Sequence, residues 1–163
     1  MATLERIHFV PHYLVRRENA VAYSPSSSRP SIEGLPQIFW ADYAPWREAN
    51  LWAVERATTG DASLKTVASN MNGLLNYAKF LESRDLQWFE FPARKADRCL
   101  VLYRGALIKM RDAGQISPST ASEYMRNCIM FYRWVRHREL LSPHVQLWRE
   151  KPYVVKYFDR VGF

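Results

Sequence analysis

Two stretches of the sequence place small hydroxyl residues ahead of basic residues at helical spacing. In the stretch that begins at Ser117, the face opposite the apolar residues carries Ser119, Ser122, Glu123, Arg126, Met130, Arg133 and His137. Successive residues of an α-helix are turned by about 100°, so these side chains share one outward face. The start of a helix has free N–H groups and a positive dipole end, which favour an anion. This face is therefore suited to a phosphate at its start, with arginines reaching further phosphates or base edges.

The second stretch begins near Ser63. Its outward face starts similarly, with Lys65, Thr66, Ser69 and Asn70, and continues with Asn76. The same residue types occur on any solvated helix face, so plain solvent-exposed surface stays open as the alternative. If both stretches contact DNA, the candidate residues are Lys65, Thr66, Ser69, Asn70, Ser119, Thr120, Ser122, Arg126 and Arg133.

The residue types that catalysis or metal binding would need do not form a known pattern. His8 and His12 have no acidic partner at a set spacing, and His137 lies between two arginines, which is unfavourable for a metal ligand. The sequence contains no Gly-x-Ser-x-Gly, phosphate-loop or His-Glu-x-x-His motif. Cys99 and Cys128 lie in apolar stretches, which indicates reduced core cysteines of a cytoplasmic protein. We therefore expect no catalytic residues, no cofactor and no metal in this chain.

Apolar residues at three- and four-residue spacing predict the helices that would position the candidate residues. The clearest pattern covers residues 63–84. A similar pattern follows Ser117-Pro118, where serine suits the N-cap and proline the first helical position. Further helices are predicted over residues 45–57 and 92–112, and a short one from Ser142-Pro143 up to Arg149. The residues predicted to be buried are Leu64, Met71, Leu74, Leu81, Leu107, Tyr124, Cys128, Phe131 and Val135.

Aromatic residues are a second candidate for nucleic-acid contact. The run Phe131-Tyr132-Arg133-Trp134 could stack on single-stranded bases. However, Phe131 and Tyr132 lie on the apolar face at helical spacing, which favours packing in the core. Trp88, Phe89 and Phe91, between two predicted helices, are likewise interpreted as a plug of the core rather than a ligand cage.

Residues 1–60 differ in pattern from the rest of the chain. Short apolar runs on either side of Arg17-Glu18-Asn19 predict a small β-hairpin, and Ser24–Pro30 reads as a polar linker. No alternation typical of strands interrupts residues 45–150. The predicted fold is therefore an all-α bundle of four or five helices over residues 37–150. An N-terminal extension and Ser/Pro linker would occupy residues 1–36, and the start of another linker residues 151–163.

The net charge of the 163 residues is +7 and is concentrated in the second half. Residues 1–60 are neutral overall, whereas residues 61–150 carry +5. A basic domain suggests an anionic partner, either nucleic acid or a membrane surface. No run approaches the roughly 20 apolar residues that a membrane span needs, and because residues 1–12 lack a basic patch followed by an apolar core, we do not expect them to be a secretory signal. Duplex DNA, and no membrane, is therefore the predicted partner.

Residues 63–150 resemble the N-terminal core-binding domain, of the SAM-like type, of the tyrosine recombinases or phage integrases. The first matching motif is Thr66-x(3)-Asn70-x(3)-Leu74 with Phe80-Leu81. The second is similar to the family's helix pattern Ser/Thr-x-x-Thr … Phe-Tyr-x-Trp-Leu, and consists of Ser117-Pro118-Ser119-Thr120, Tyr124-Met125 and Phe131–Val135. The chain departs from the family in having Ser142-Pro143 instead of Asn-Pro, and Asn70 where an aromatic residue is common.

The resemblance implies an all-α domain that clamps duplex DNA beside the strand-exchange site in DNA integration. In the family, catalytic arginines, a His-x-x-Arg motif and a tyrosine nucleophile lie in a separate C-terminal domain, and the core-binding domains help to assemble a tetramer. No histidine here begins a His-x-x-Arg motif. We therefore expect this chain to be inert by itself and to be the N-terminal part of a longer integrase of a mobile element. A helical protein-interaction domain, an RNA-binding protein and a stand-alone recombination accessory factor stay open as alternatives.

Overall fold

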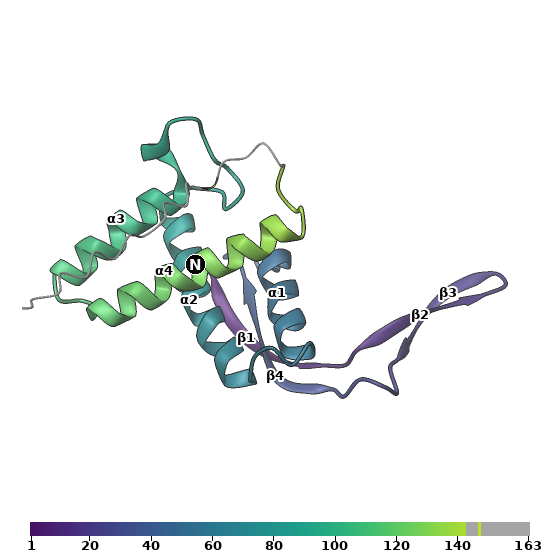
Figure 1. Cartoon of the computed structure of the whole chain (residues 1–163). Coiled ribbons are helices and arrows are strands. Elements are labelled where there is room, and N and C mark those ends of the chain that lie inside the picture. Colours follow the sequence, from purple (N-terminus) through teal and green to yellow (C-terminus); the bar gives the residue numbers. More distant parts are fainter. Residues whose placement is uncertain (143–146, 148–163) are drawn as a thin grey trace, which may run out of the picture.

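The structure is a computed structural model of the whole chain, and it describes residues 1–142 and Leu147 (Figure 1). The predicted all-α class is wrong, because two antiparallel two-stranded sheets precede the helices. The strands are β1 (Thr3–Phe9), β2 (His12–Arg17), β3 (Ala20–Pro25) and β4 (Ile32–Phe39). The helices are α1 (Arg47–Thr58), α2 (Leu64–Ser83), the 3-10 helix η1 (Lys95–Asp97), α3 (Cys99–Asp112) and α4 (Pro118–His137).

The strand β4 was not predicted from the sequence. It contains Gly34 and Pro36, two residue types that are depleted in strands, so local propensity argued against it. Gly34 has a φ of +72° and lies where the register against β1 shifts. At this β-bulge, β4 has one residue more than β1 between two paired positions. The boundary expected between residues 36 and 37 falls inside this strand.

The β1–β4 ladder packs onto α1 and α2 and shares their core (Figure 1). Ala2, Leu35 and Ile38 are buried. The side-chain amide of the buried Asn50, on α1, accepts a hydrogen bond from Ile38 N at 2.7 Å and donates one to Ile38 O at 3.0 Å. Because both backbone groups of Ile38 are satisfied in this way, the outer edge of β4 is joined to α1 inside the protein.

The second ladder, β2–β3, is the predicted hairpin, and its two-residue turn is Glu18-Asn19. We call this hairpin (residues 12–25) the arm. The arm extends away from the rest of the molecule (Figure 1). The predicted polar linker is shorter than expected, because Ser24 and Pro25 belong to β3.

All four long predicted helices are present, and two of them begin with a serine N-cap, of which Ser117 was predicted. Ser63 and Ser117 each accept a hydrogen bond from the backbone N–H three residues later, at 3.2 and 3.1 Å. One boundary differs: α3 begins at Cys99 rather than near Pro92. The Arg98 guanidinium instead donates to the carbonyl oxygen of Pro92, and residues 92–98 form a loop that includes the short 3-10 helix η1. Of the short helix predicted from Ser142 to Arg149, only Ser142 and Leu147 lie in the described part.

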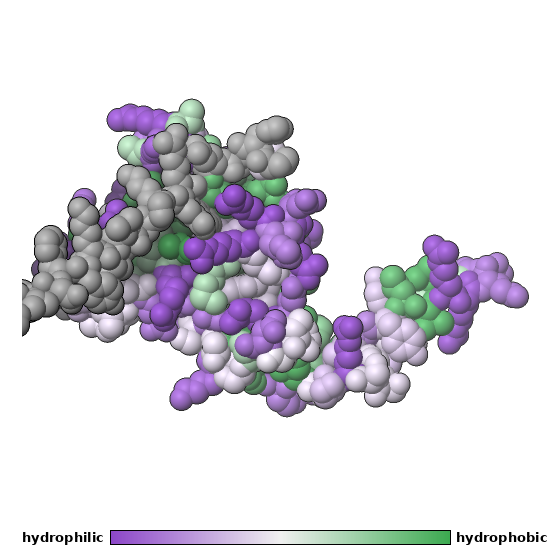
Figure 2. All heavy atoms as spheres, in the orientation of Figure 1, coloured by the Kyte–Doolittle hydropathy of each residue, from purple (hydrophilic) through white to green (hydrophobic). Residues whose placement is uncertain are grey.

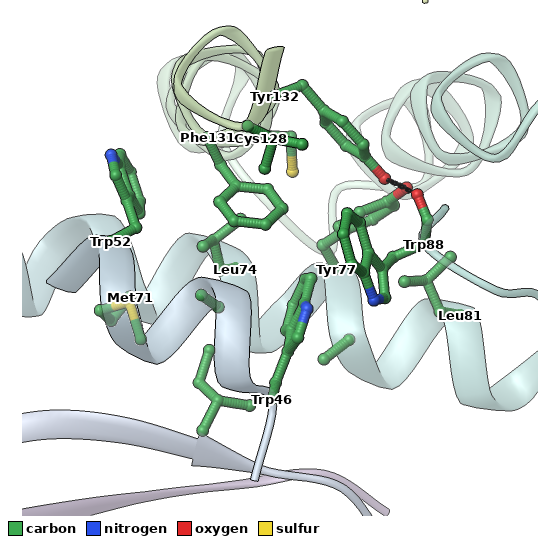
Figure 3. Packing of buried hydrophobic residues seen from close by; sticks show 14 of the residues in the cluster. Trp46, Trp52, Met71, Leu74, Tyr77, Leu81, Trp88, Cys128, Phe131 and Tyr132 are labelled. Atoms are coloured by element: carbon green, nitrogen blue, oxygen red, sulfur yellow. Dashed lines mark hydrogen bonds between the residues drawn. The ribbon is translucent and has the colours of Figure 1, made fainter. Parts of the chain in front are cut away.

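The core is rich in aromatic side chains (Figure 3). Phe131 packs edge-on against Trp46, Trp52 and Trp88. Tyr132 donates to the carbonyl oxygen of Trp88 at 2.6 Å and accepts from the Tyr77 hydroxyl at 2.8 Å. Leu64 and Tyr124 are only half-buried, so their predicted burial is wrong. The burial prediction is confirmed for Met71, Leu74, Leu81, Leu107, Cys128, Phe131 and Val135.

The plug predicted between two helices is only partly formed. Trp88 is buried and Phe91 half-buried, but Phe89 is 48% exposed. Within residues 1–142, no helix has the length and apolar character needed to cross a membrane.

Candidate nucleic-acid interface

The two helices that carry the candidate residues, α2 and α4, pack directly against each other. They cross where Gly73 of α2 faces Asn127 of α4. A methyl group on Gly73 would come within 2.9 Å of Asn127 Cβ. Glycine is therefore required here for the close approach of the two helices, and the crossing fixes which surfaces remain outside.

Contacts between α2 and α4 advance along both helices together. Ser69 donates to Glu123 at 2.7 Å, the Asn70 amide donates to Asn127 at 2.9 Å, and further along Tyr77 meets Tyr132. The contact therefore advances toward the C-terminal ends of both helices as they cross. As a result, the beginnings of both helices lie on the same side of the crossing.

Neither helix start carries an acidic residue in its first turn. An acidic residue there would offset the positive end of the helix dipole. On α2 the first turn instead contains the exposed Lys65, which adds to the positive potential. Both starts are therefore left without the carboxylate that usually neutralises them, and a phosphate would be favoured at either one.

Two shallow grooves flank α4. The α2–α4 groove is lined by Arg56, Lys65, Thr66, Ser69, Asn70, Glu123, Arg126, Asn127 and Met130. The α3–α4 groove has an apolar floor and is lined by Arg104, Leu107, Ile108, Arg111, Pro118, Ala121, Ser122, Met125, Arg126, Ile129, Met130 and Arg133.

In the lining of these two grooves, positively charged side chains strongly outnumber negatively charged ones. Their combined lining holds six basic side chains and one carboxylate, that of Glu123. Arg126 lies between the two grooves and lines both of them. Among the described residues, neither Arg126 nor Lys65 has a side-chain hydrogen bond or ion pair. Both cations are therefore available to an anion from outside.

Most of the candidate residues are placed outward as expected. Lys65, Thr66, Ser69, Ser119, Ser122, Arg126 and Arg133 are exposed, and Thr120 is half-buried. The hydroxyls of Thr66, Ser119 and Thr120 also lie 2.8 to 3.0 Å from the hydroxyls of the N-cap serines. These hydroxyls thus form part of the helix caps at the two helix starts.

The expected outward position of Asn70 is wrong. Asn70 is 7% exposed because its side chain donates to Asn127 in the contact between the helices. Its Oδ1 is buried and has no hydrogen-bond partner among the described residues. Asn70 therefore helps to position α2 against α4, beneath the groove that its neighbours line.

Three basic residues of the grooves were missed in the sequence, namely Arg56, Arg104 and Arg111. Arg104 and Arg111 are seven residues apart on α3, a spacing that places both on one helix face, and this signal could have found them. Arg56 lies on α1, and its guanidinium is 5.4 Å from the centre of the Trp52 ring. Arg111 is ion-paired with Asp112 at 2.8 Å.

The aromatic run on α4 does not offer a stacking surface. Phe131 and Tyr132 are fully buried, and the half-buried Trp134 donates its indole N–H to Glu55 at 3.1 Å. Burial raises the pKa of the Cys128 thiol and of the Tyr77 and Tyr132 hydroxyls well above their usual values. These groups are therefore neutral and sealed in the core. Among residues 1–142 and Leu147, no three side chains of His, Cys, Asp or Glu form a group that could hold a metal ion.

Comparison with models of known protein families, with curated proteins and with solved structures gave no match.

Proposed function

We propose that this chain is a DNA-binding module that holds duplex DNA against the two grooves flanking α4. The observation that carries the proposal is the charge of that surface, six basic side chains against one carboxylate. Phosphate contacts supply much of the affinity of proteins for DNA, because Lys and Arg side chains displace the counterions condensed on the DNA, and they need cations without a partner in the protein. Lys65 and Arg126 meet that need.

The arrangement of α4 supports duplex DNA in particular. Its exposed residues Ser119, Ser122, Arg126 and Arg133 lie within 15 residues, and the first and last are about 21 Å apart along the helix. The major groove of DNA is about 12 Å wide and admits one α-helix. In the proposed complex the starts of α2 and α4 bind phosphate, and Arg126 extends along the groove or the adjacent backbone.

The resemblance of residues 63–150 to the core-binding domain of tyrosine recombinases gives this proposal its biological setting. The module would clamp one side of the DNA beside the strand-exchange site during DNA integration. Other recombinase protomers would be its partners in a tetramer. We propose no catalytic residue in this chain, so incubation with supercoiled DNA should give neither nicks nor a covalent adduct.

The test is a titration of a recombination half-site duplex with the wild-type chain, Lys65→Ala and Arg126→Ala. For one domain we expect dissociation constants of about 10⁻⁴ to 10⁻⁶ M at physiological salt. Each variant should reduce the slope of log affinity against log salt by about one if the lost contact is to phosphate. If Arg126 reads a base edge, its variant should lose about 1 to 3 kcal/mol and relax the preference at one base pair.

The matched control is Arg47→Ala, which removes an exposed arginine that lines neither groove. This control should bind as the wild type does. Unchanged affinity in both groove variants would contradict the proposal. Equal losses in all three variants would show that only net charge matters. Competition with duplex RNA separates DNA binding from RNA binding, because the deep, narrow major groove of RNA does not admit a helix.

A further inference from the structure

The arm exposes apolar side chains on one of its faces. Residues paired across an antiparallel ladder lie on the same face, so Leu14 and Tyr23 form one pair and Val21 lies beside them, opposite Arg16. Leu14, Val21 and Tyr23 are 61%, 62% and 75% exposed. Figure 2 shows hydrophobic side chains gathered on the arm, with hydrophilic ones beyond them.

Such a surface indicates a partner. A single two-stranded hairpin is only marginally stable in water, and a cluster of exposed apolar side chains is typical of an interaction site. The end of the arm is basic, because Arg16 and Arg17 precede the turn and Glu18 is the one acidic residue there. The partner must therefore offer apolar area together with negative charge.

A hollow of about 630 Å³ at the end of α2 has both properties. Trp40, Leu81 and Leu86 contribute its apolar walls. Its lining also contains three acidic residues, Asp42, Glu82 and Asp85, against two cationic groups, Lys79 and the N-terminal ammonium of Met1, which is ion-paired with Glu82.

The two exposed carboxylates of the hollow are the ones open to a new partner. Asp42 and Asp85 are exposed. Glu82 is already engaged, because its carboxylate accepts hydrogen bonds from the backbone N–H groups of Ala2 and Ala41. The hollow also adjoins the negative end of the α2 dipole, whose last turn has no basic residue to offset it. A cation from another molecule would therefore be favoured here.

The arm and the hollow lie at opposite ends of β1. The hollow includes Met1, whereas the arm follows Phe9 at the other end of the strand. Seven strand residues span about 20 Å, and the arm extends further from the body (Figure 1). The arm is thus directed away from the hollow of its own chain.

We propose that the arm of one copy of this chain docks into the hollow of a second copy. Leu14, Val21 and Tyr23 cover Trp40 and Leu86, while Arg16, on the same face of the arm, lies near Asp42 and Asp85. The contact is head-to-tail, since each copy uses two different surfaces, and such contacts build rings or open chains. This interaction is independent of DNA binding, which uses the opposite end of α2.

Sedimentation velocity over a concentration series tests the proposal on the full chain without DNA. The wild type should associate with increasing concentration. The arm variant Leu14→Ser/Tyr23→Ser and the hollow variant Asp42→Asn/Asp85→Asn should each weaken association at least tenfold. Asparagine is chosen because Asp85 has a φ of +53° and Asp42 accepts a hydrogen bond from Ala44, and asparagine suits both conditions.

Two further measurements make the test specific. Tyr13→Ser changes a residue that is 54% exposed on the other face of the arm, and it should leave association unchanged. When the arm variant and the hollow variant are mixed, one intact arm can still meet one intact hollow. A complex of one copy of each should therefore form with wild-type affinity, although each variant alone associates at least tenfold more weakly.

Three results would overturn the proposal. The first is a wild type that stays monomeric at every concentration. The second is a mixture of the two variants that does not associate, which would indicate a contact between identical surfaces. The third is an arm variant that keeps its association but loses affinity for duplex DNA, which would make the arm a DNA contact. Circular dichroism spectra equal to the wild type confirm that the variants are folded.

Discussion

The helical body and the arm use apolar residues in opposite ways. In the body, Phe131 is fully buried among three tryptophans, whereas Leu14 and Tyr23 of the arm are mostly exposed. Burial of apolar area is the main term that stabilises a fold, so the body supplies nearly all the stability of this chain. The apolar residues of the arm contribute little to folding and remain free to stabilise an association.

The largest effect that distinguishes the two regions should come from alkaline pH. Burial is the largest cause that raises the pKa values of Tyr77, Tyr103 and Tyr132 in the body. In the unfolded chain these hydroxyls ionise near pH 10, so above that pH the unfolded state binds fewer protons and becomes favoured. The stability should be complete below about pH 10 and fall steadily above it.

The measurement is a series of urea titrations followed by tryptophan fluorescence from neutral to strongly alkaline pH. The Tyr132→Phe variant should lose less stability between neutral and alkaline pH than the wild type does. A midpoint that is constant above pH 10 would show that these hydroxyls ionise freely in the folded state.

The next largest effect should come from truncating one aromatic residue of the body. Phe131→Ala removes the ring at the centre of the aromatic core and should lower the free energy of unfolding by about 3 to 5 kcal/mol. The matched change in the arm, Leu14→Ala, should stay within about 0.5 kcal/mol of the wild type. Equal losses in the two variants, measured by urea unfolding, would contradict the division between body and arm.

Replacing each of two glycines of the body by alanine should change the stability by a smaller amount and in opposite directions. Gly73→Ala places a methyl group against Asn127 and should cost about 1 to 3 kcal/mol through overpacking. Gly105, on α3, has no atom within 4 Å of the same position. Gly105→Ala should therefore stabilise the protein by about 0.5 to 1 kcal/mol, because alanine favours a helix more than glycine does. Thermal unfolding of the two variants, compared with the wild type, gives the sign of each effect.

The helices could be predicted from the sequence because their signals are local. The apolar spacing of residues 63–84 and the Ser117-Pro118 start both act within one element, and both predictions are confirmed. The β1–β4 ladder could not be predicted in this way. Its pairing joins residues about 30 positions apart, and β4 is stabilised by Asn50 and by burial against α1 rather than by its own propensity.

The candidate surface was likewise predicted only where its residues follow from the periodicity of a single helix. The periodicity of α4 alone indicates the outward positions of Ser119, Ser122 and Arg126. Asn70 was misplaced because its burial depends on Asn127, a residue of another helix. Arg56 was missed because only the packing of α1 beside α2 and α4 brings it to the groove.

The position of the arm in the chain also has a consequence for engineering. β1 and β4 pair along their length, and the arm is an insertion between their adjacent ends, Phe9 and Ile32. Strands paired in this way can be joined by a turn of a few residues. The segment between them can therefore be replaced by a short turn, a peptide tag or another hairpin. The β1–β4 pairing and the helices that carry the basic grooves should be unaffected by this replacement.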